Sequence, residues 1–205
     1  MNWPLGIALT VYRDLPIAEA AALAKQDGFA HLDAMQDSPE NLAVPLGDGY
    51  ALRPTPGFTS GPAAEGQRSW EKTVADFRRA PGSRLEPWPG SVVGSTEAVL
   101  AFLEEVPGLR LTLDVGHVTA WGGDPLELLP YADHVQLRQA KPGATQAPHD
   151  GVVDFAAILK RLSDLNYSRL LTIEYFDLPE RGWPLEDPLG AARETAAQLR
   201  SLGLR

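Results

Sequence analysis

The sequence predicts an α/β protein of the (β/α) barrel class, and three observations carry that prediction. Short apolar segments alternate with helix-like segments along the 205 residues, which is the order of a parallel sheet covered by helices. About seven such units follow one another, whereas a complete eight-unit barrel needs about 250 residues. No glycine-rich G-x-G-x-x-G turn follows the first strand, so a doubly wound open sheet is the weaker alternative. We expect one domain over residues 1–205, a shortened barrel with one strand-helix unit missing or degenerate.

The individual elements follow from hydrophobic spacing and from turn residues. The predicted strands are GIALTV (6–11), FAHLDAM (29–35), a short one near 42–46, SRLEPWPG (83–90), LRLTLDVGH (109–117), HVQLRQA (134–140) and RLLTIEYFD (169–177). The predicted helices are IAEAAALAKQDG (17–28), SWEKTVADFRRA (69–80), STEAVLAFLEEV (95–106), DPLELLPYA (124–132), DFAAILKRLSDLNY (154–167) and PLGAARETAAQLRSLG (188–203). Ser69, Ser95, Asp124 and Asp154 are the expected N-terminal caps.

The segment 36–66 carries several prolines and glycines. Beyond the short strand near 42–46 it predicts a long loop, and a loop of that length in a compact domain is either functional or disordered. Arg53 lies within it between Leu52 and Pro54. We expect Arg53 either to be a solvated loop residue or to reach into a site and contact substrate.

Composition excludes several classes of function. Lys and Arg total 18 against 27 Asp and Glu, a net charge of -9, so nucleic acid is not an expected partner. The absence of cysteine excludes disulfides, thiolate metal sites and thiol nucleophiles. The N-terminus lacks a basic region before its short apolar run, and no apolar stretch approaches the ~20 residues that cross a bilayer. We therefore expect a cytoplasmic protein without membrane contact.

Polar side chains stand where four of the predicted strands end. These residues are Glu86, Asp114, Gln136 with Arg138, and Glu174. The carboxyl ends of barrel strands meet at one mouth, where barrel enzymes build their sites. A single acid at such a position is more simply a turn or helix cap. Three carboxylates in one shielded mouth would repel one another unless a cation neutralised them, so their convergence predicts a divalent metal.

These segments together resemble a known family. The order of Glu in LEPWPG, Asp and His in LDVGH, the HVQLR strand, the VDFAAILKRLSDLNY helix and Glu in TIEY is similar to that of the xylose isomerase-like barrels. That family holds sugar isomerases and epimerases, some dehydratases and the distant apurinic endonucleases. The resemblance is strong over residues 83–176, moderate over 1–35 and absent between them. It implies a barrel enzyme with a divalent metal such as Mn²⁺, Mg²⁺, Co²⁺ or Zn²⁺.

The resemblance also implies roles for particular residues. Glu86, Asp114 and Glu174 would ligate the metal, and Glu86 and Glu174 would in addition form the acid/base pair of an isomerase or epimerase. His117 would lie beside the metal, either as a further ligand or as a contact to substrate. The fourth ligand position, a histidine in the family pattern H-V-H-L-K-D, is occupied here by Gln136. An amide oxygen binds transition metals less well than imidazole does.

Other residues near the strand ends are candidates for substrate binding. Arg138 could hold a carboxylate or phosphate group of the substrate, and Trp88 could stack on a sugar face or simply pack at the rim. His149 and Asp150 stand in the region where the family often carries G-E-G, and the alternative for both is an exposed loop before Asp154. His134 lies two positions before Gln136 on the same strand face, about 6 to 7 Å farther from the strand end, and is expected to be structural.

The function that the resemblance implies is that of a metal-dependent isomerase or epimerase of a sugar, a sugar phosphate or a hydroxy-keto acid. A lyase or dehydratase would use the same metal and a similar base, and a degenerate barrel that only binds a small ligand would show the same missing histidine. An apurinic endonuclease is disfavoured by the four histidines and the acidic charge. We expect a small-molecule substrate and a homodimer that covers the 36–66 side.

Overall fold

The computed structural model describes residues 3–12, 15–35, 51–55, 58–59 and 66–204. Its strands are β1 (Leu5–Ala8), β2 (His31–Met35), β3 (Ala51–Thr55), β4 (Phe58–Thr59), β5 (Arg84–Glu86), β6 (Arg110–Asp114), β7 (Ala132–Leu137) and β8 (Leu171–Ile173). Its α-helices are α1 (Ile17–Gln26), α3 (Gly66–Arg79), α4 (Thr96–Glu105), α5 (Val115–Ala120), α6 (Pro125–Leu128), α7 (Phe155–Asp164) and α8 (Pro188–Ser201). Short 3₁₀ turns cover Leu9–Tyr12, Leu129–Tyr131 and Pro179–Arg181.

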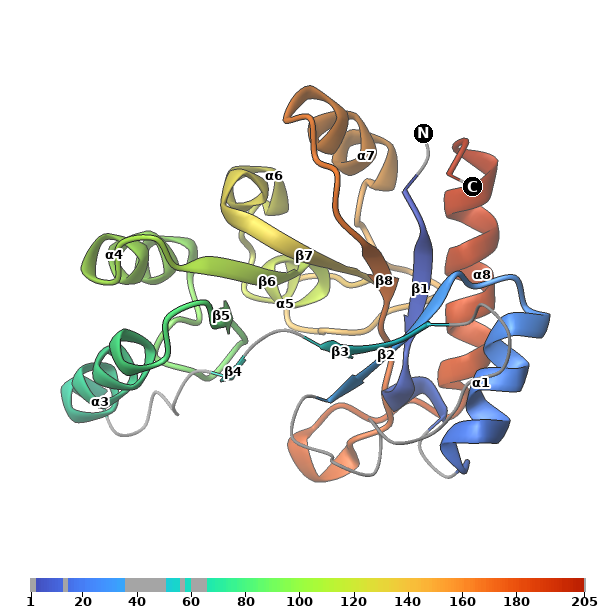
Figure 1. Cartoon of the computed structure of the whole chain (residues 1–205), viewed down its shortest axis with the longest axis horizontal. Coiled ribbons are helices and arrows are strands. Elements are labelled where there is room, and N and C mark those ends of the chain that lie inside the picture. The colour runs from blue at the N-terminus through green and yellow to red at the C-terminus, as the bar shows by residue number, and fades with distance from the viewer. Residues whose placement is uncertain (1–2, 13–14, 36–50, 56–57, 60–65, 205) are drawn as a thin grey trace.

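The described strands form one eight-stranded sheet in the order β3-β2-β1-β8-β7-β6-β5-β4, and every pair in it is parallel. Sequential strands are neighbours except for β3 and β4, and β1 pairs with β8, which is the circular order of a (β/α) barrel. Most of the helices lie outside the sheet, whereas α5 lies near the ends of β6 and β7 (Figure 1). The predicted barrel class is therefore confirmed.

The two ends of this sheet, β3 and β4, belong to one stretch of chain. β3 pairs with β2 and β4 pairs with β5, yet only residues 56–57 separate them, far fewer than the dozen or more that a crossover between neighbouring parallel strands needs. The stretch 51–59 thus supplies the strand between β2 and β5 in two pieces, with no helix between them (Figure 1). The strand-helix unit that we expected to be missing or degenerate therefore corresponds to this stretch.

The prediction of a loop throughout 47–66 was wrong for residues 51–55 and 58–59, which are strands. Pro54 had argued against a strand because it donates no backbone hydrogen bond, but an outer strand tolerates proline, and β3 is last in the sheet order. The short strand expected near 42–46 lies outside the described residues.

The helices bury one apolar face against the sheet, as their spacing predicts. On α7, Phe155, Ile158, Leu159 and Leu162 are each at most 2% exposed. Burial of each such side chain contributes about 1.5–3 kcal/mol. Asp154 caps this helix by accepting the Ala157 N–H at 2.9 Å, so the expected cap is confirmed.

Two further expected caps are confirmed and one is wrong. Ser95 accepts the Ala98 N–H at 3.2 Å to begin α4, and Asp124 accepts the Leu126 N–H at 2.9 Å to begin α6. Ser69 does not cap α3, because that helix begins three residues earlier at Gly66. Its carbonyl instead accepts the Thr73 hydroxyl at 2.7 Å inside the helix.

A cluster of polar side chains lies inside the sheet below the strand ends. Asp33 of β2 is 2% exposed and accepts the Thr172 hydroxyl at 2.5 Å. The Nε2 atom of His134 lies 3.0 Å from Asp33 Oδ2, and that of His31 lies 3.3 Å from Oδ1. The His31 ring occupies the space in which a side chain at Gly6 would lie, since a Cβ there would stand 2.1 Å from the ring. This cluster ties β1, β2, β7 and β8 together.

Among the described residues, no helix is both long enough and apolar enough to span a membrane.

Candidate active site

The site is built around Asp114, the last residue of β6. Its Oδ1 atom accepts the backbone N–H of Gly116 at 2.7 Å and that of His117 at 3.2 Å, which begins α5 directly after the strand. The predicted strand 109–117 therefore ends at Asp114, because this carboxylate satisfies the first free N–H groups of a helix. The side chain is both a helix cap and a site residue, and its Oδ2 atom takes no part in the cap.

Arg138, one residue beyond β7, extends into the space beside Asp114. Its side chain is fully buried, and Nη2 forms an ion pair with Oδ2 of Asp114. Nη1 lies 3.4 Å from the backbone oxygen of Glu174 and 3.7 Å from its carboxylate Oε2. The guanidinium also lies 4.4 Å from the centre of the Phe176 ring. A buried positive charge held by carboxylates and an aromatic face is a stable arrangement for arginine.

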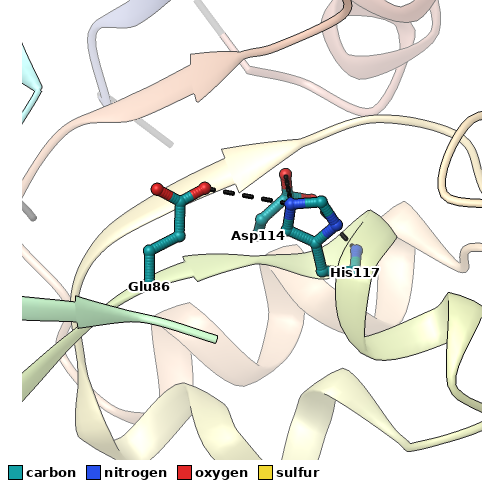
Figure 2. Close-up of side chains that lie close together, drawn as sticks. All are labelled: Glu86, Asp114 and His117. Atoms are coloured by element: carbon teal, nitrogen blue, oxygen red, sulfur yellow. Dashed lines mark hydrogen bonds and ion pairs between the residues drawn. The ribbon is translucent and has the colours of Figure 1, made fainter. Parts of the chain in front are cut away.

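His117 comes from α5 and completes the group on the same side as Asp114. Its Nε2 atom lies 3.7 Å from Asp114 Oδ2 and 3.9 Å from Oε1 of Glu86, which ends β5 (Figure 2). Arg138 Nη2 lies 3.2 and 3.3 Å from its two ring nitrogens. Burial, and then the charge of Arg138, lower the pKa of His117 well below its ordinary value. The imidazole is therefore neutral at neutral pH and has one nitrogen that can accept a hydrogen bond or bind a metal.

The two glutamates of the site differ from Asp114 in their access to solvent. The side chains of Glu86 and Glu174 are 19% and 11% exposed, whereas those of Asp114 and Arg138 are completely buried. A substrate entering the mouth of the barrel would therefore meet the glutamates first. Asp114 and Arg138 form the layer beneath them.

The pKa values of these carboxyl groups are raised. Burial, and then the charge of Asp114, raise the pKa of Glu86 to about 7. Burial, and then the charge of Glu86, raise the pKa of Glu174 well above its ordinary value. Burial also raises the pKa of Asp114, although Arg138 and the two backbone N–H groups oppose this effect. Both glutamates therefore bind a proton more tightly than an ordinary glutamate does, a property often found in groups that act in acid/base chemistry.

The donor atoms present fit a divalent cation. Glu86, Asp114 and His117 each offer one ligand atom, and the three atoms lie within 4.8 Å of one another. Two carboxylates with an imidazole suit Mn²⁺, Co²⁺ or Zn²⁺. Gln136 is the register partner of Asp114 and is 1% exposed, and its Oε1 atom has no hydrogen-bond partner among the described residues. The predicted role of Gln136 as a fourth ligand stays a prediction.

An aromatic wall, which we define as Trp88, Phe176 and Trp183, borders the site. The Trp183 ring lies 6.0 Å from Trp88, 5.5 Å from Phe176 and 5.5 Å from His117. Sequence reasoning missed Trp183, which stands in the loop after β8. The position of that loop was the available signal, because the segments that follow barrel strands form the mouth.

Comparison with known proteins decides the family. Residues 56–202 match the sequence profile described as "Xylose isomerase-like TIM barrel", which is well over half of the chain. The chain belongs to this family. A comparison of the chain with curated proteins found no match.

Several solved structures are similar to this xylose isomerase-like barrel. D-psicose 3-epimerase from Clostridium cellulolyticum H10 has a TM-score of 0.68 at 14% identity, over 97% of this chain and 99% of that one. A xylose isomerase domain-containing protein from Salmonella typhimurium LT2 has a TM-score of 0.63 at 15% identity, over 98% and 99%. The probable 3-DHS dehydratase of Bacillus anthracis has a TM-score of 0.61 at 14% identity, over 97% and 99%. At these identities the likeness shows a shared fold.

The remaining residues proposed from sequence for this xylose isomerase-like barrel are Arg53, His149 and Asp150, and the predicted role of Arg53 stays a prediction. Arg53 is in β3, opposite Asp33 in the register, and its side chain lies outside the described residues. The His149 side chain is 84% exposed and lies 3.8 Å from Glu194 on α8. Asp150 is exposed and forms an ion pair with Lys141. The exposed-loop alternative for His149 and Asp150 thus agrees with where they lie.

Proposed function

We propose that this protein is a divalent-metal-dependent isomerase or epimerase that moves a proton beside the carbonyl of a small hydroxy-carbonyl compound. The substrate class is a sugar, a sugar phosphate or a hydroxy-keto acid. One observation carries the proposal: Glu86 and Glu174, from the ends of β5 and β8, are partly exposed, both have a raised pKa, and they stand above the buried Asp114–Arg138 pair. Two such carboxyl groups can remove and return a proton at one carbon.

The reaction assigned to the residues is a proton exchange. One glutamate, as carboxylate, takes the proton from the C–H next to the carbonyl, and the bond electrons move onto the carbonyl oxygen. The other glutamate, as carboxylic acid, donates a proton to the resulting enediolate. An epimerase receives this proton at the same carbon on the opposite face; an isomerase receives it at the former carbonyl carbon, while the proton of the neighbouring hydroxyl passes to the former carbonyl oxygen. In the metal-free protein, a pKa near 7 leaves both the acid and the carboxylate form of Glu86 present at neutral pH.

A cation held by Glu86, Asp114 and His117 would supply charge stabilisation for the substrate oxygens. Asp114 is suited to anchor such a cation because two backbone N–H groups fix its carboxylate. The neutral His117 offers a nitrogen rather than a positive charge. The aromatic wall gives an apolar surface against which the carbon face of a sugar can stack.

Solvent hydrogen exchange tests the assignment directly. The protein, loaded with Mn²⁺ or Co²⁺, is incubated in D₂O with a panel of ketoses, ketose phosphates and hydroxy-keto acids, and deuterium at the carbon next to the carbonyl is followed by NMR. Replacement of Glu174 by Gln should lower exchange by about 10²–10⁴-fold without unfolding the protein. The matched control is Glu194→Gln, since that carboxylate is 65% exposed on α8. Retained exchange in Glu174→Gln would overturn the base assignment.

A dehydratase is the second candidate, because one similar structure is described as a probable 3-DHS dehydratase. In that reaction the same base removes the proton, but a neighbouring hydroxyl leaves as water and a carbon–carbon double bond forms. The panel separates the two, since dehydration gives an ultraviolet-absorbing product and isomerisation conserves the mass of the substrate. A barrel that only binds its ligand would give neither product nor exchange.

A further inference from the structure

We propose that Arg138 competes with the divalent cation for Asp114 and His117, so that this arginine sets the metal affinity of the site. The inference rests on the metal site of the proposed function and adds a residue that controls its occupancy. The guanidinium is a cation already bound to two of the three candidate ligands. Metal binding therefore requires Arg138 to give up contacts that the protein now satisfies.

The competition is for the same atoms. Asp114 Oδ1 is occupied by two backbone N–H groups, so Oδ2 is the oxygen left for a metal, and Oδ2 is the atom that pairs with Arg138. A neutral imidazole has a single acceptor nitrogen. Both ring nitrogens of His117 lie within 3.3 Å of Arg138 Nη2. One guanidinium nitrogen thus lies within contact distance of His117 as well as of Asp114 Oδ2, so the positive charge of Arg138 stands beside two of the candidate ligands.

The arginine is held in place by more than the carboxylate. Its side chain is fully buried, stacks on Phe176 and fills the space beside Gly116, where a Cβ would lie 2.5 Å from Nε. This environment keeps the positive charge close to the ligand atoms, where it repels a second cation. Two of the site's features thus oppose metal binding, since Gln136 in addition replaces the imidazole of the family pattern with a weaker ligand.

Glu174 offers a second position for the displaced guanidinium. Nη1 of Arg138 already lies 3.7 Å from Glu174 Oε2 and 3.4 Å from the Glu174 backbone oxygen. A small rotation toward Glu174 would free Asp114 Oδ2 and His117 while the arginine keeps a carboxylate partner. The metal-loaded site would then hold its cation on Glu86, Asp114 and His117, with Arg138 paired to Glu174.

Titration calorimetry with Mn²⁺ alone tests the inference. Arg138→Met removes the charge but keeps an unbranched side chain, and it should bind Mn²⁺ at least tenfold more tightly than the natural protein. Arg138→Lys retains the charge and should show a smaller gain. The control is Arg110→Met, which also removes one positive charge but at the opposite end of the barrel, where Arg110 pairs with Asp133; its affinity should change by less than about twofold. Equal or weaker binding by Arg138→Met would overturn the inference.

A crystal structure of the natural protein with Mn²⁺ provides a test that needs no variant. The ion pair between Arg138 and Asp114 should be broken in it, and an intact pair beside a metal bound to Asp114 would contradict the competition. These tests of the competition can succeed or fail independently of the proposed isomerase or epimerase function. If Arg138→Met binds metal more tightly but no substrate shows proton exchange, the competition is supported and the isomerase function is contradicted. If its metal affinity is unchanged and the natural protein exchanges protons on a substrate, the competition is contradicted and the isomerase function is supported.

Discussion

Arg138 fills the space that Gly116 leaves by having no side chain. A Cβ at position 116 would lie 2.5 Å from Arg138 Nε, 2.7 Å from its Cγ and 2.7 Å from the backbone oxygen of Thr145. The glycine of the DVGH segment is thus required by an arginine 22 residues later in the chain. Without that close approach, the guanidinium could not reach Asp114 at the start of the same helix.

Replacement of Gly116 by Ala should therefore lower the free energy of unfolding by about 1–3 kcal/mol, the usual cost of an overpacked site. Urea denaturation monitored by circular dichroism measures it. In the background of Arg138→Ala the same replacement should cost at least about 1 kcal/mol less, because one of its two clashes is gone. Strictly additive effects of the two substitutions would show that Gly116 and Arg138 do not share this space.

Loss of Trp183 should weaken substrate binding more than it slows the chemistry. Its ring lies 5.5 Å from both His117 and Phe176 but is not among the groups that hold or move the proton. For the substrate identified by hydrogen exchange, we expect Trp183→Ala to raise KM about tenfold and to change kcat by less than about threefold. Trp70→Phe is the control, since Trp70 packs on Phe102 away from the mouth. A fall in kcat with unchanged KM would argue for a direct part in the reaction.

The raised pKa values of Glu86 and Glu174 predict that the metal-free protein loses stability as pH rises. Both groups bind protons more tightly in the folded protein than in the unfolded chain, so between about pH 5 and pH 7 the folded state carries more protons. The titration of Glu86 alone should lower the unfolding free energy by about 2 kcal/mol over this range, and that of Glu174 should act in the same direction. Denaturation in EDTA at a series of pH values measures the slope.

The variant Glu86→Gln identifies the source of that slope. An amide does not titrate, so this variant should lose part of the decline and be more stable than the natural protein above pH 7. Asp150→Asn is the control, because that carboxylate is exposed and its pKa is lowered by Lys141 rather than raised. An unchanged slope in Glu86→Gln would place the titrating group elsewhere.

The sequence was sufficient to predict the barrel and to place Glu86, Asp114 and Glu174 at strand ends. The reason is local: an apolar run that ends in an acid marks the carboxyl end of a strand, and parallel topology brings such ends to one edge. The hydrophobic spacing of α7 and the caps at Ser95 and Asp154 followed from the same short-range patterns.

Features that depend on three-dimensional packing could not be obtained in this way. The sequence marks Arg138 as a residue near a strand end, but nothing in HVQLRQ indicates that its guanidinium is fully buried against Asp114. The split strand at 51–59 was hidden by Pro54, whose effect depends on the position of β3 in the sheet. Trp183 lies in an irregular loop, where no periodicity identifies the side chains that face the site.

Asp33 should contribute more to stability than an aspartate in an exposed ion pair does, because it is the common partner of the buried polar cluster inside the barrel. Thr172 donates to it at 2.5 Å, and His134 and His31 lie 3.0 and 3.3 Å from its oxygens. Asp33→Ala would leave these groups buried without that acceptor and should cost about 2–4 kcal/mol of unfolding free energy. The matched variant is Asp27→Ala, whose carboxylate pairs with the half-exposed Arg193 at 2.9 Å and should contribute about 1 kcal/mol or less. Equal losses in the two variants would mean that the cluster inside the barrel is no more stabilising than an ion pair in solvent.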